Sequence, residues 1–310
     1  MGFQGKISEI TLGTAQIGSN YGIANKKGKI SRKKGIEILN TAWINGITCF
    51  DTSPVYGDSE IVIGTFLSSY NPSPSPMIIT KLPKIMSEDI KNTVNFNRQI
   101  ERFVINSLHS LKINTIPIYL IHHAPNLWEK KGIILNILKG MKEKGLIKNL
   151  GVSVYNPEDV QNAIETNLIR TIQIPINIFD LRLLNSGLLR ELEKSKFIVF
   201  ARSIFLQGLF FLKPNELPNG MEIAIKPLLK LNEIAESNES SISEIVFSFM
   251  KSLPGITSFL VGTETKQQVL ENIKVFKSSK PLTSSLLNEI IDTFCDLPVN
   301  LINPNLWNRK

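Results

Sequence analysis

The strongest constraint on the fold is an alternation of short apolar runs with longer segments of helical period, which occurs eight times along the chain. The runs that we predict to be strands are residues 7–16, 47–53, 77–82, 118–123, 148–154, 171–177, 197–203 and 256–262. Helical segments include 33–46 and 96–112, and in the second of these apolar residues recur at steps of three and four, at Ile100, Phe103, Val104, Leu108 and Leu111. Apolar strands that alternate with helices predict a parallel sheet covered by helices.

Eight strand–helix units in 310 residues predict a closed (β/α)8 barrel, a fold that takes about 250 residues plus insertions. The alternative is an open doubly wound sheet, which usually carries the glycine pattern G-x-G-x-x-G after its first strand. Segment 13–22, GTAQIGSNYG, lacks that pattern, so we favour the barrel. No change in composition divides the chain, and we predict an α/β TIM barrel as a single domain over residues 1–310. Its core spans about residues 7–295, loop 212–220 extends over the barrel mouth, and an irregular tail, 296–310, lies over the C-terminal face.

The composition argues against several classes of protein. No apolar run approaches the roughly 20 residues of a membrane-spanning helix, and Lys6 and Glu9 interrupt the apolar stretch that a secretory signal needs. Two cysteines, Cys49 and Cys295, provide neither a disulfide framework nor a cysteine metal cluster. The net charge of +8 is dispersed without a nucleic-acid motif, and a basic surface also suits an anionic cofactor or a phosphorylated substrate. We therefore expect a cytoplasmic protein without a nucleic-acid or membrane partner.

Polar side chains gather at the C-terminal ends of the predicted strands, where parallel barrels place their functional groups. Asp51 lies near the end of the second run, with Tyr56 five residues later, Lys81 ends the third run, and the fourth ends in His122 and His123. Each residue alone has a structural alternative: a capping aspartate, a packing tyrosine, a solvated lysine or a histidine bound to a backbone carbonyl. Together they favour a site, because a buried aspartate and a buried lysine at neighbouring strand ends need each other as partners.

This set of side chains suits one kind of chemistry. Tyrosine is a poor acid at neutral pH, and we expect the nearby ammonium of Lys81 to lower the pKa of Tyr56. Asp51 would keep Lys81 charged and oriented, and His122 would bind the substrate oxygen. The arrangement indicates proton donation to a carbonyl oxygen while a hydride reaches its carbon. Since no side chain supplies hydride, a nicotinamide cofactor is implied.

Seven segments of the sequence resemble the aldo-keto reductase family in the expected order, from about residue 9 to residue 275. They are LGTAQIG (12–18), CFDTSPVYGDSE (49–60), ITKLP (79–83), IYLIHHAP (118–125), GLIKNLGVSVYN (145–156), IQIPINIFD (172–180) and VGTETKQQVLENI (261–273). The resemblance implies an NAD(P)-dependent reductase or dehydrogenase, without a metal, whose catalytic residues are Asp51, Tyr56, Lys81 and His122. It places His123 toward the substrate, and Tyr21 is a second candidate for a substrate contact.

The resemblance also implies a set of cofactor-binding residues: Gly13, Thr14, Ser153, Gln173, Arg202, Ser203, Phe205, Gln207, Gly208, Gly262, Thr263, Gln267, Gln268, Glu271 and Asn272. Ser153 and Gln173 would bind the nicotinamide carboxamide, and Arg202 stands where relatives stack an aromatic ring on the nicotinamide. Gly262 and Gln268 replace the Lys and Arg that many relatives use for the 2′-phosphate of NADP, although Lys266 could substitute. The family favours NADP(H) slightly, with NAD(H) second.

Two other functions remain as alternatives. A regulatory protein could keep the fold and bind cofactor without turnover, but it would not need all four catalytic groups. A metal-dependent hydrolase could use Asp51, His122 and His123, but adjacent residues on a strand point to opposite faces. Segments 12–31 and 205–210 resemble bacterial family members linked to sugar and surface-polysaccharide metabolism. We therefore predict a small-molecule substrate, a sugar or sugar nucleotide, and a monomer or small homo-oligomer.

Overall fold

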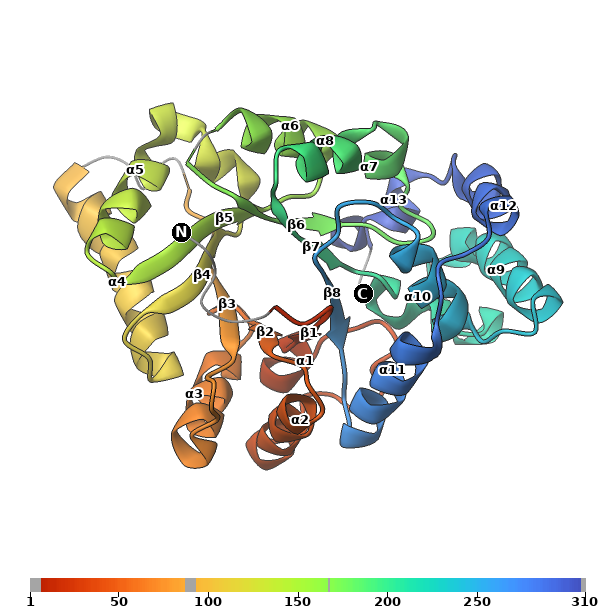
Figure 1. Cartoon of the computed structure of the whole chain (residues 1–310), viewed down its shortest axis with the longest axis horizontal. Coiled ribbons are helices and arrows are strands. Elements are labelled where there is room, and N and C mark those ends of the chain that lie inside the picture. The colour runs from red at the N-terminus through yellow and green to blue at the C-terminus, as the bar shows by residue number, and fades with distance from the viewer. Residues whose placement is uncertain (1–6, 87–92, 167, 308–310) are drawn as a thin grey trace.

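Eight strands, each parallel to its neighbours, close into a barrel in the order β1 to β8 (Figure 1). The structure is a computed structural model that describes residues 7–86, 93–166 and 168–307. The strands are β1 Ile10–Gly13, β2 Cys49–Asp51, β3 Met77–Leu82, β4 Ile116–Ile121, β5 Ile147–Ser153, β6 Thr171–Pro175, β7 Ile198–Arg202 and β8 Ser258–Gly262. The ring closes where Gly13 of β1 pairs with Asp51 of β2 and with Gly262 of β8. The predicted barrel is confirmed, and the open sheet is wrong.

The helices lie around the outside of the strands (Figure 1). They are α1 Ala15–Gly18, α2 Arg32–Ile44, α3 Ser59–Tyr70, α4 Thr93–Leu111, α5 Glu129–Glu143, α6 Pro157–Glu165, α7 Arg182–Asn185, α8 Leu188–Lys194, α9 Ile225–Ser237, α10 Ile242–Lys251, α11 Lys266–Ser278, α12 Ser284–Phe294 and α13 Val299–Ile302. In α4, Ile100, Val104, Leu108 and Leu111 are buried and Phe103 packs half-buried against the same core. This apolar face is the one that the helical period predicted. No helix in the described ranges is long and apolar enough to span a membrane.

The barrel interior and the layer between strands and helices form two separate apolar clusters. The buried members of the smaller cluster come from β2, β3, β4 and β7: Cys49, Met77, Ile79, Ile118, Leu120 and Phe200. Successive side chains on a strand point to opposite faces, so residues two apart share a face. Asp51 therefore follows Cys49 on the inward face, and Lys81 follows Ile79. This parity brings both charges to the top of the barrel interior.

The connections differ from the expectation mainly in the tail. Residues predicted to be irregular include the short helix α13 and a 3-10 turn, η6 Pro304–Leu306. They are held because Leu301, Ile302 and Trp307 are buried, and the Trp307 indole donates to the Leu301 carbonyl at 3.0 Å. The predicted excursion at 212–220 belongs to a longer β7–α9 connection with three 3-10 turns, η3 Leu206–Phe211, η4 Pro214–Glu216 and η5 Glu222–Ala224. Residues 1–6 and 308–310 of the predicted single domain lie outside the described residues.

Candidate active site

The four predicted catalytic side chains converge at the C-terminal end of the barrel. The Lys81 Nζ lies 2.8 Å from both carboxylate oxygens of Asp51 and 5.0 Å from the centroid of the Tyr56 ring. The rings of Tyr56 and His122 meet edge to face, with centroids 6.0 Å apart. Since His122 follows Leu120 by two residues, it shares the inward face with Lys81, whereas His123 points away from it.

Tyr56 is held by a tight turn between β2 and α3. Its N–H donates to the Ser53 carbonyl at 2.9 Å, and its own carbonyl accepts from Ser59 at 3.2 Å. Gly57 follows with φ of 59°, and a Cβ there would fall on the Gly18 carbonyl oxygen of α1. The left-handed conformation and this close approach both require glycine.

Lys81 uses all three of its N–H groups within the site. It is fully buried, and besides the two Asp51 oxygens it donates to the Thr52 carbonyl at 2.8 Å. The Asp51 Oδ1 also accepts from the Gln173 amide at 2.8 Å. Burial lowers the pKa of Lys81, and the Asp51 carboxylate opposes that effect. The Lys81–Asp51 pair is therefore a fixed, buried ion pair, in which Gln173 holds the carboxylate.

The acidity of Tyr56 differs from the expectation. Burial first, and then the Asp51 carboxylate, raise the pKa of Tyr56 above its ordinary value. The predicted lowering of this pKa was wrong because burial has the largest effect on Tyr56, and because the Lys81 ammonium is paired with the Asp51 carboxylate. Among the described residues, Arg202 is the charge that lowers the pKa of Tyr56. The phenol therefore stays protonated at neutral pH, which is the form that gives a proton to a carbonyl oxygen.

His122 is a neutral imidazole at neutral pH. Burial, followed by the charges of Lys81 and Arg202, lowers the pKa of His122 to about 3. Its Nδ1 lies 3.4 Å from the Ser53 hydroxyl, at the outer limit of a hydrogen bond. A neutral ring next to the Tyr56 hydroxyl can orient a substrate oxygen without competing for the proton that is transferred.

Two hollows meet at Tyr56. The first, which we call the inner cavity, has a volume of about 550 Å³ and is lined by Tyr21, Tyr56, His122, Ser153, Tyr155, Gln173, Arg202, Gln207, Pro304, Asn305 and Trp307. His123 does not line it. Sequence analysis missed Tyr155 and the three tail residues Pro304, Asn305 and Trp307. The sequence signal that could have indicated Tyr155 is its position, since it directly follows Ser153 and Val154 at the end of the predicted fifth strand.

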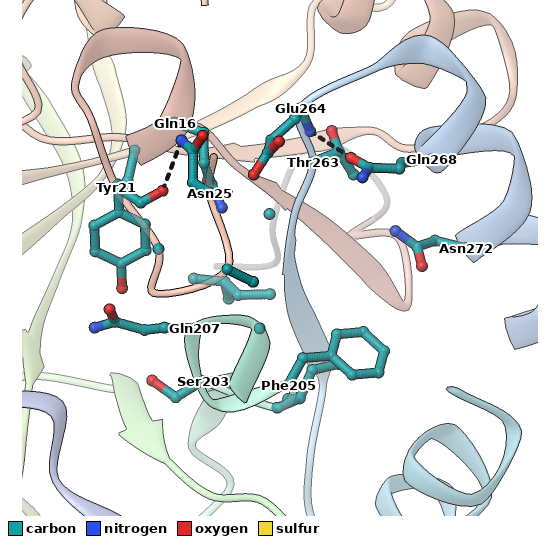
Figure 2. Close-up of a pocket in the computed structure, with 18 of the residues that line it drawn as sticks. Gln16, Tyr21, Asn25, Ser203, Phe205, Gln207, Thr263, Glu264, Gln268 and Asn272 are labelled. Carbon is teal, nitrogen blue, oxygen red and sulfur yellow. Dashed lines mark hydrogen bonds between the residues drawn. The ribbon is translucent and has the colours of Figure 1, made fainter. Parts of the chain in front are cut away.

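The second hollow, the outer groove, has a volume of about 470 Å³ and lies between the connections that follow β1, β7 and β8 (Figure 2). Most predicted cofactor residues line it: Gly13, Gln173, Arg202, Ser203, Phe205, Gln207, Gly208, Gly262, Thr263, Gln268, Glu271 and Asn272. Figure 2 shows Tyr21 and Gln207 on one side and Gln268 and Asn272 on the other. Lining residues that the sequence did not predict are Ala15, Gln16, Gly22, Ala24, Asn25, Ile204, Phe211, Ser243, Leu260 and Glu264.

Comparisons with known proteins show the family to which the chain belongs. Residues 9–292 match the family described as the Aldo/keto reductase family. The chain belongs to this family. It is 30% identical over 194 residues to the aldo-keto reductase YhdN of Bacillus subtilis, and 31% identical over 128 residues to the D-arabinose 1-dehydrogenase of Saccharomyces cerevisiae. These matches cover 61% and 38% of this chain, but only 53% and 36% of the two relatives.

Solved aldo-keto reductases share the fold. The holo form of the aldo-keto reductase AKR11C1 from Bacillus halodurans superposes with a TM-score of 0.73 at 16% identity, over 97% of this chain and 96% of that one. The glycerol dehydrogenase AKR11B4 from Gluconobacter oxydans gives a TM-score of 0.70 at 22% identity, over 100% of this chain and 96% of that one. At this level of identity, the likeness shows the fold alone.

Three predicted cofactor residues of this aldo/keto reductase lie elsewhere. Thr14 is buried and does not line the groove; its hydroxyl donates to the Asp51 carbonyl at 2.7 Å and bonds with the Ser59 hydroxyl at 2.6 Å. The Gln267 side-chain amide donates a hydrogen bond along α11 to the Glu271 carboxylate, at 3.0 Å. Ser153 lines the inner cavity, 3.4 Å from the Gln173 side-chain oxygen. Thr14 therefore bonds with the backbone of Asp51, while Ser153 lines the inner cavity and Gln173 lines both hollows.

The backbone after β7 has an unusual conformation where it lines the groove. Ser203, Leu206, Gln207 and Gly208 have positive φ values of 61°, 46°, 56° and 90°. The Gln207 carbonyl accepts from the Ile23 N–H at 3.1 Å, which joins this connection to the one that follows β1. Left-handed non-glycine residues are costly and are concentrated at functional sites. The strain here shapes one wall of the groove.

The groove is suited to a dinucleotide. The Thr263 hydroxyl is buried without a hydrogen-bond partner among the described residues. Nearby, α11 begins at Lys266 after the cap Thr265, and the Glu264 N–H donates to the Gln268 side-chain oxygen at 2.7 Å (Figure 2). A helix N-terminus and an unsatisfied hydroxyl both favour a polar, anionic ligand. The residues present fit a nicotinamide dinucleotide.

Proposed function

We propose that this protein is an NAD(P)(H)-dependent oxidoreductase that interconverts a carbonyl compound and an alcohol, with Tyr56 as the proton donor. The observation that carries the proposal is the protonated phenol of Tyr56 at the point where the inner cavity and the outer groove meet. The names of the two relatives, a reductase and a dehydrogenase, support the same reaction class.

The bound nicotinamide would supply the hydride. Tyr56 holds the proton that its phenolic oxygen gives to the substrate carbonyl oxygen. The phenolate that remains is stabilised by the positive charge of Arg202, which lowers the pKa of Tyr56. The Lys81 ammonium, 5.0 Å from the ring centroid, packs against the ring as an ion pair with Asp51. Asp51 and Gln173 keep Lys81 in place. His122 orients the substrate oxygen as a neutral hydrogen-bonding group.

We further propose NAD(H) as the preferred cofactor, against the slight lean of the sequence toward NADP(H). Glu264 and Glu271 line the groove next to Gln268, and their carboxylates would repel a 2′-phosphate. Lys266 does not line the groove; its ammonium pairs with Glu37 of α2 at 3.2 Å. Fluorescence titration with NADH and NADPH tests this preference. Tighter binding of NADPH would overturn it.

For the substrate we propose a sugar or sugar derivative. The inner cavity combines the aromatic rings of Tyr155 and Trp307 with hydrogen-bonding groups such as Asn305, a combination that suits a polyhydroxylated ring. The yeast relative is named a D-arabinose 1-dehydrogenase. A cytoplasmic location, a monomeric or small homo-oligomeric state, and the absence of nucleic-acid and membrane partners remain predictions.

The test is the variant Tyr56→Phe. Because general acid catalysis contributes about 100- to 10,000-fold, we expect kcat to fall by at least about 100-fold while the Kd for cofactor stays within a factor of about two. Tyr70→Phe is the matched control, since Tyr70 is 49% exposed at the end of α3. Turnover by Tyr56→Phe at the wild-type rate would show that Tyr56 is not the acid. A wild-type protein that binds cofactor and turns over no carbonyl would favour the regulatory alternative.

A further inference from the structure

Arg202, the last residue of β7, lies where the inner cavity and the outer groove meet. Its guanidinium stacks on the Tyr155 ring, 4.1 Å from the centroid, and its Nη2 donates to the Val154 carbonyl at 2.8 Å. It is half-buried, and within the described ranges of the chain it forms no ion pair with an acidic side chain. A partly buried positive charge without a counter-ion costs free energy of folding. Such a charge beside the catalytic tyrosine therefore indicates a ligand that carries the opposite charge.

The inner cavity carries a positive field that Arg202 dominates. No Asp or Glu is among the described residues that line the cavity. Lys81 is neutralised by Asp51, and His122 is uncharged because its pKa is lowered to about 3. Arg202 is therefore the single formal charge among the described residues that line the cavity, and the cavity attracts an anion.

The Arg202 guanidinium is also held in one orientation. Its stacking partner Tyr155 is fixed at both ends: the Tyr155 hydroxyl bonds with the Asn305 side chain of the tail, and its carbonyl accepts from Arg182 at 3.2 Å. Arg182 is itself paired with Asp180 at 2.8 Å. Three parts of the chain thus preorganise a single guanidinium fork. Its Nε is buried without a partner among the described residues, and its Nη1 reaches only the Ser203 hydroxyl, at 3.4 Å, which leaves the Nη1 end of the guanidinium for a ligand.

From this arrangement we propose that Arg202 binds a carboxylate of the carbonyl substrate and so makes the enzyme selective for oxo acids, such as uronic acids, over neutral carbonyl compounds. The proposal rests on the proposed function, since the carbonyl must lie at Tyr56 and His122. A guanidinium fork matches the two oxygens of a carboxylate, which gives orientation as well as affinity. A phosphate could use the same charge, so the experiment separates the two anions.

The experiment compares kcat/KM within matched pairs that differ in one charge. The carboxylate pairs are D-glucuronate with D-glucuronamide, and 4-carboxybenzaldehyde with its methyl ester. The phosphate pair is D-glyceraldehyde 3-phosphate with D-glyceraldehyde. We expect the wild-type protein to favour the carboxylate of each pair, and Arg202→Met to reduce the carboxylate-to-neutral ratio by about tenfold to 100-fold.

Two further variants control for effects other than recognition. Arg202→Lys keeps the charge but loses the fork, so the ratio should fall between those of the wild type and Arg202→Met. Arg190→Met removes an exposed arginine of α8 and should leave the ratio unchanged. Equal use of both members of the carboxylate pairs by the wild type, or an unchanged ratio in Arg202→Met, would overturn the proposal. Selectivity that is confined to the phosphate pair would mean that Arg202 binds a phosphate and not a carboxylate.

A binding measurement separates this proposal from the proposed function. Calorimetric titration of D-glucuronate and D-glucuronamide into the cofactor-saturated protein needs no turnover. Tighter binding of the glucuronate that is lost in Arg202→Met supports the anion site even if no carbonyl is reduced. Binding of the two compounds with equal affinity, together with equal turnover, rejects the anion site while leaving the role of Tyr56 intact.

Discussion

The buried Lys81–Asp51 pair predicts a large coupling energy between two substitutions. Lys81 is 0% exposed and donates three hydrogen bonds of 2.8 Å, two of them to Asp51. Asp51→Asn keeps the shape but leaves the ammonium buried without its counter-ion. Lys81→Met removes the cation and leaves the carboxylate with the Gln173 amide alone as a side-chain donor. Each single change breaks a buried ion pair and should lower the free energy of unfolding by about 3–5 kcal/mol.

The double variant Asp51→Asn/Lys81→Met buries no charge, so its destabilisation should be far below the sum of the two single effects. We expect a coupling energy of at least about 2 kcal/mol. The assay is urea unfolding followed by tryptophan fluorescence, with the coupling taken from the four variants. The control is the same cycle on Lys144 and Glu101, a pair 3.1 Å apart whose side chains are 64% and 44% exposed. That cycle should give a coupling of about 0–1 kcal/mol.

Additive effects of Asp51→Asn and Lys81→Met would contradict this account of the site. A coupling no larger than that of Lys144 and Glu101 would mean that solvent reaches the Lys81–Asp51 pair. In that case the pair would no longer explain why Lys81 fails to lower the pKa of Tyr56.

Two further predictions concern pH and cofactor choice. Because the pKa of His122 is lowered to about 3 and that of Tyr56 is raised, His122 stays neutral and Tyr56 stays protonated, so kcat/KM for carbonyl reduction should be flat from about pH 5 to about pH 8. An inflection near pH 6.5 that disappears in His122→Gln would show that His122 titrates in the working range. Gln268→Arg places a guanidinium in the groove next to α11, and we expect NADPH to bind about tenfold more tightly while the affinity for NADH stays within a factor of about two, as measured by fluorescence titration. Unchanged NADPH affinity would mean that the 2′-phosphate lies elsewhere.

The barrel and the convergence of the four catalytic candidates could be predicted because both depend on local periodicity. The alternation of strands and helices indicates the fold, and strand parity places Asp51 and Lys81 on the inward face, above Cys49 and Ile79. The chain order of the strands then brings these groups together, since β2, β3 and β4 are neighbours in the barrel. No long-range information was needed.

The inner cavity depends instead on contacts between distant segments. Asn305 lines it because Leu301, Ile302 and Trp307 anchor the tail, and nothing in the local sequence indicates where the tail docks. The acidity of Tyr56 was mispredicted for a similar reason. The pKa of Tyr56 is raised mainly by burial and then by the Asp51 carboxylate, and the sequence motif does not show how deeply the ring is buried.

The most direct test of the central claim is the transfer of deuterium to a carbonyl compound, such as 4-carboxybenzaldehyde or its methyl ester, from NADH that carries deuterium at both positions of nicotinamide C4. The account predicts that the wild-type protein forms an alcohol with one deuterium on the former carbonyl carbon. It also predicts that Tyr56→Phe, with NADH still bound, forms this product at least about 100-fold more slowly. Formation of the labelled alcohol by Tyr56→Phe at the wild-type rate, or of unlabelled alcohol by the wild type, would contradict it.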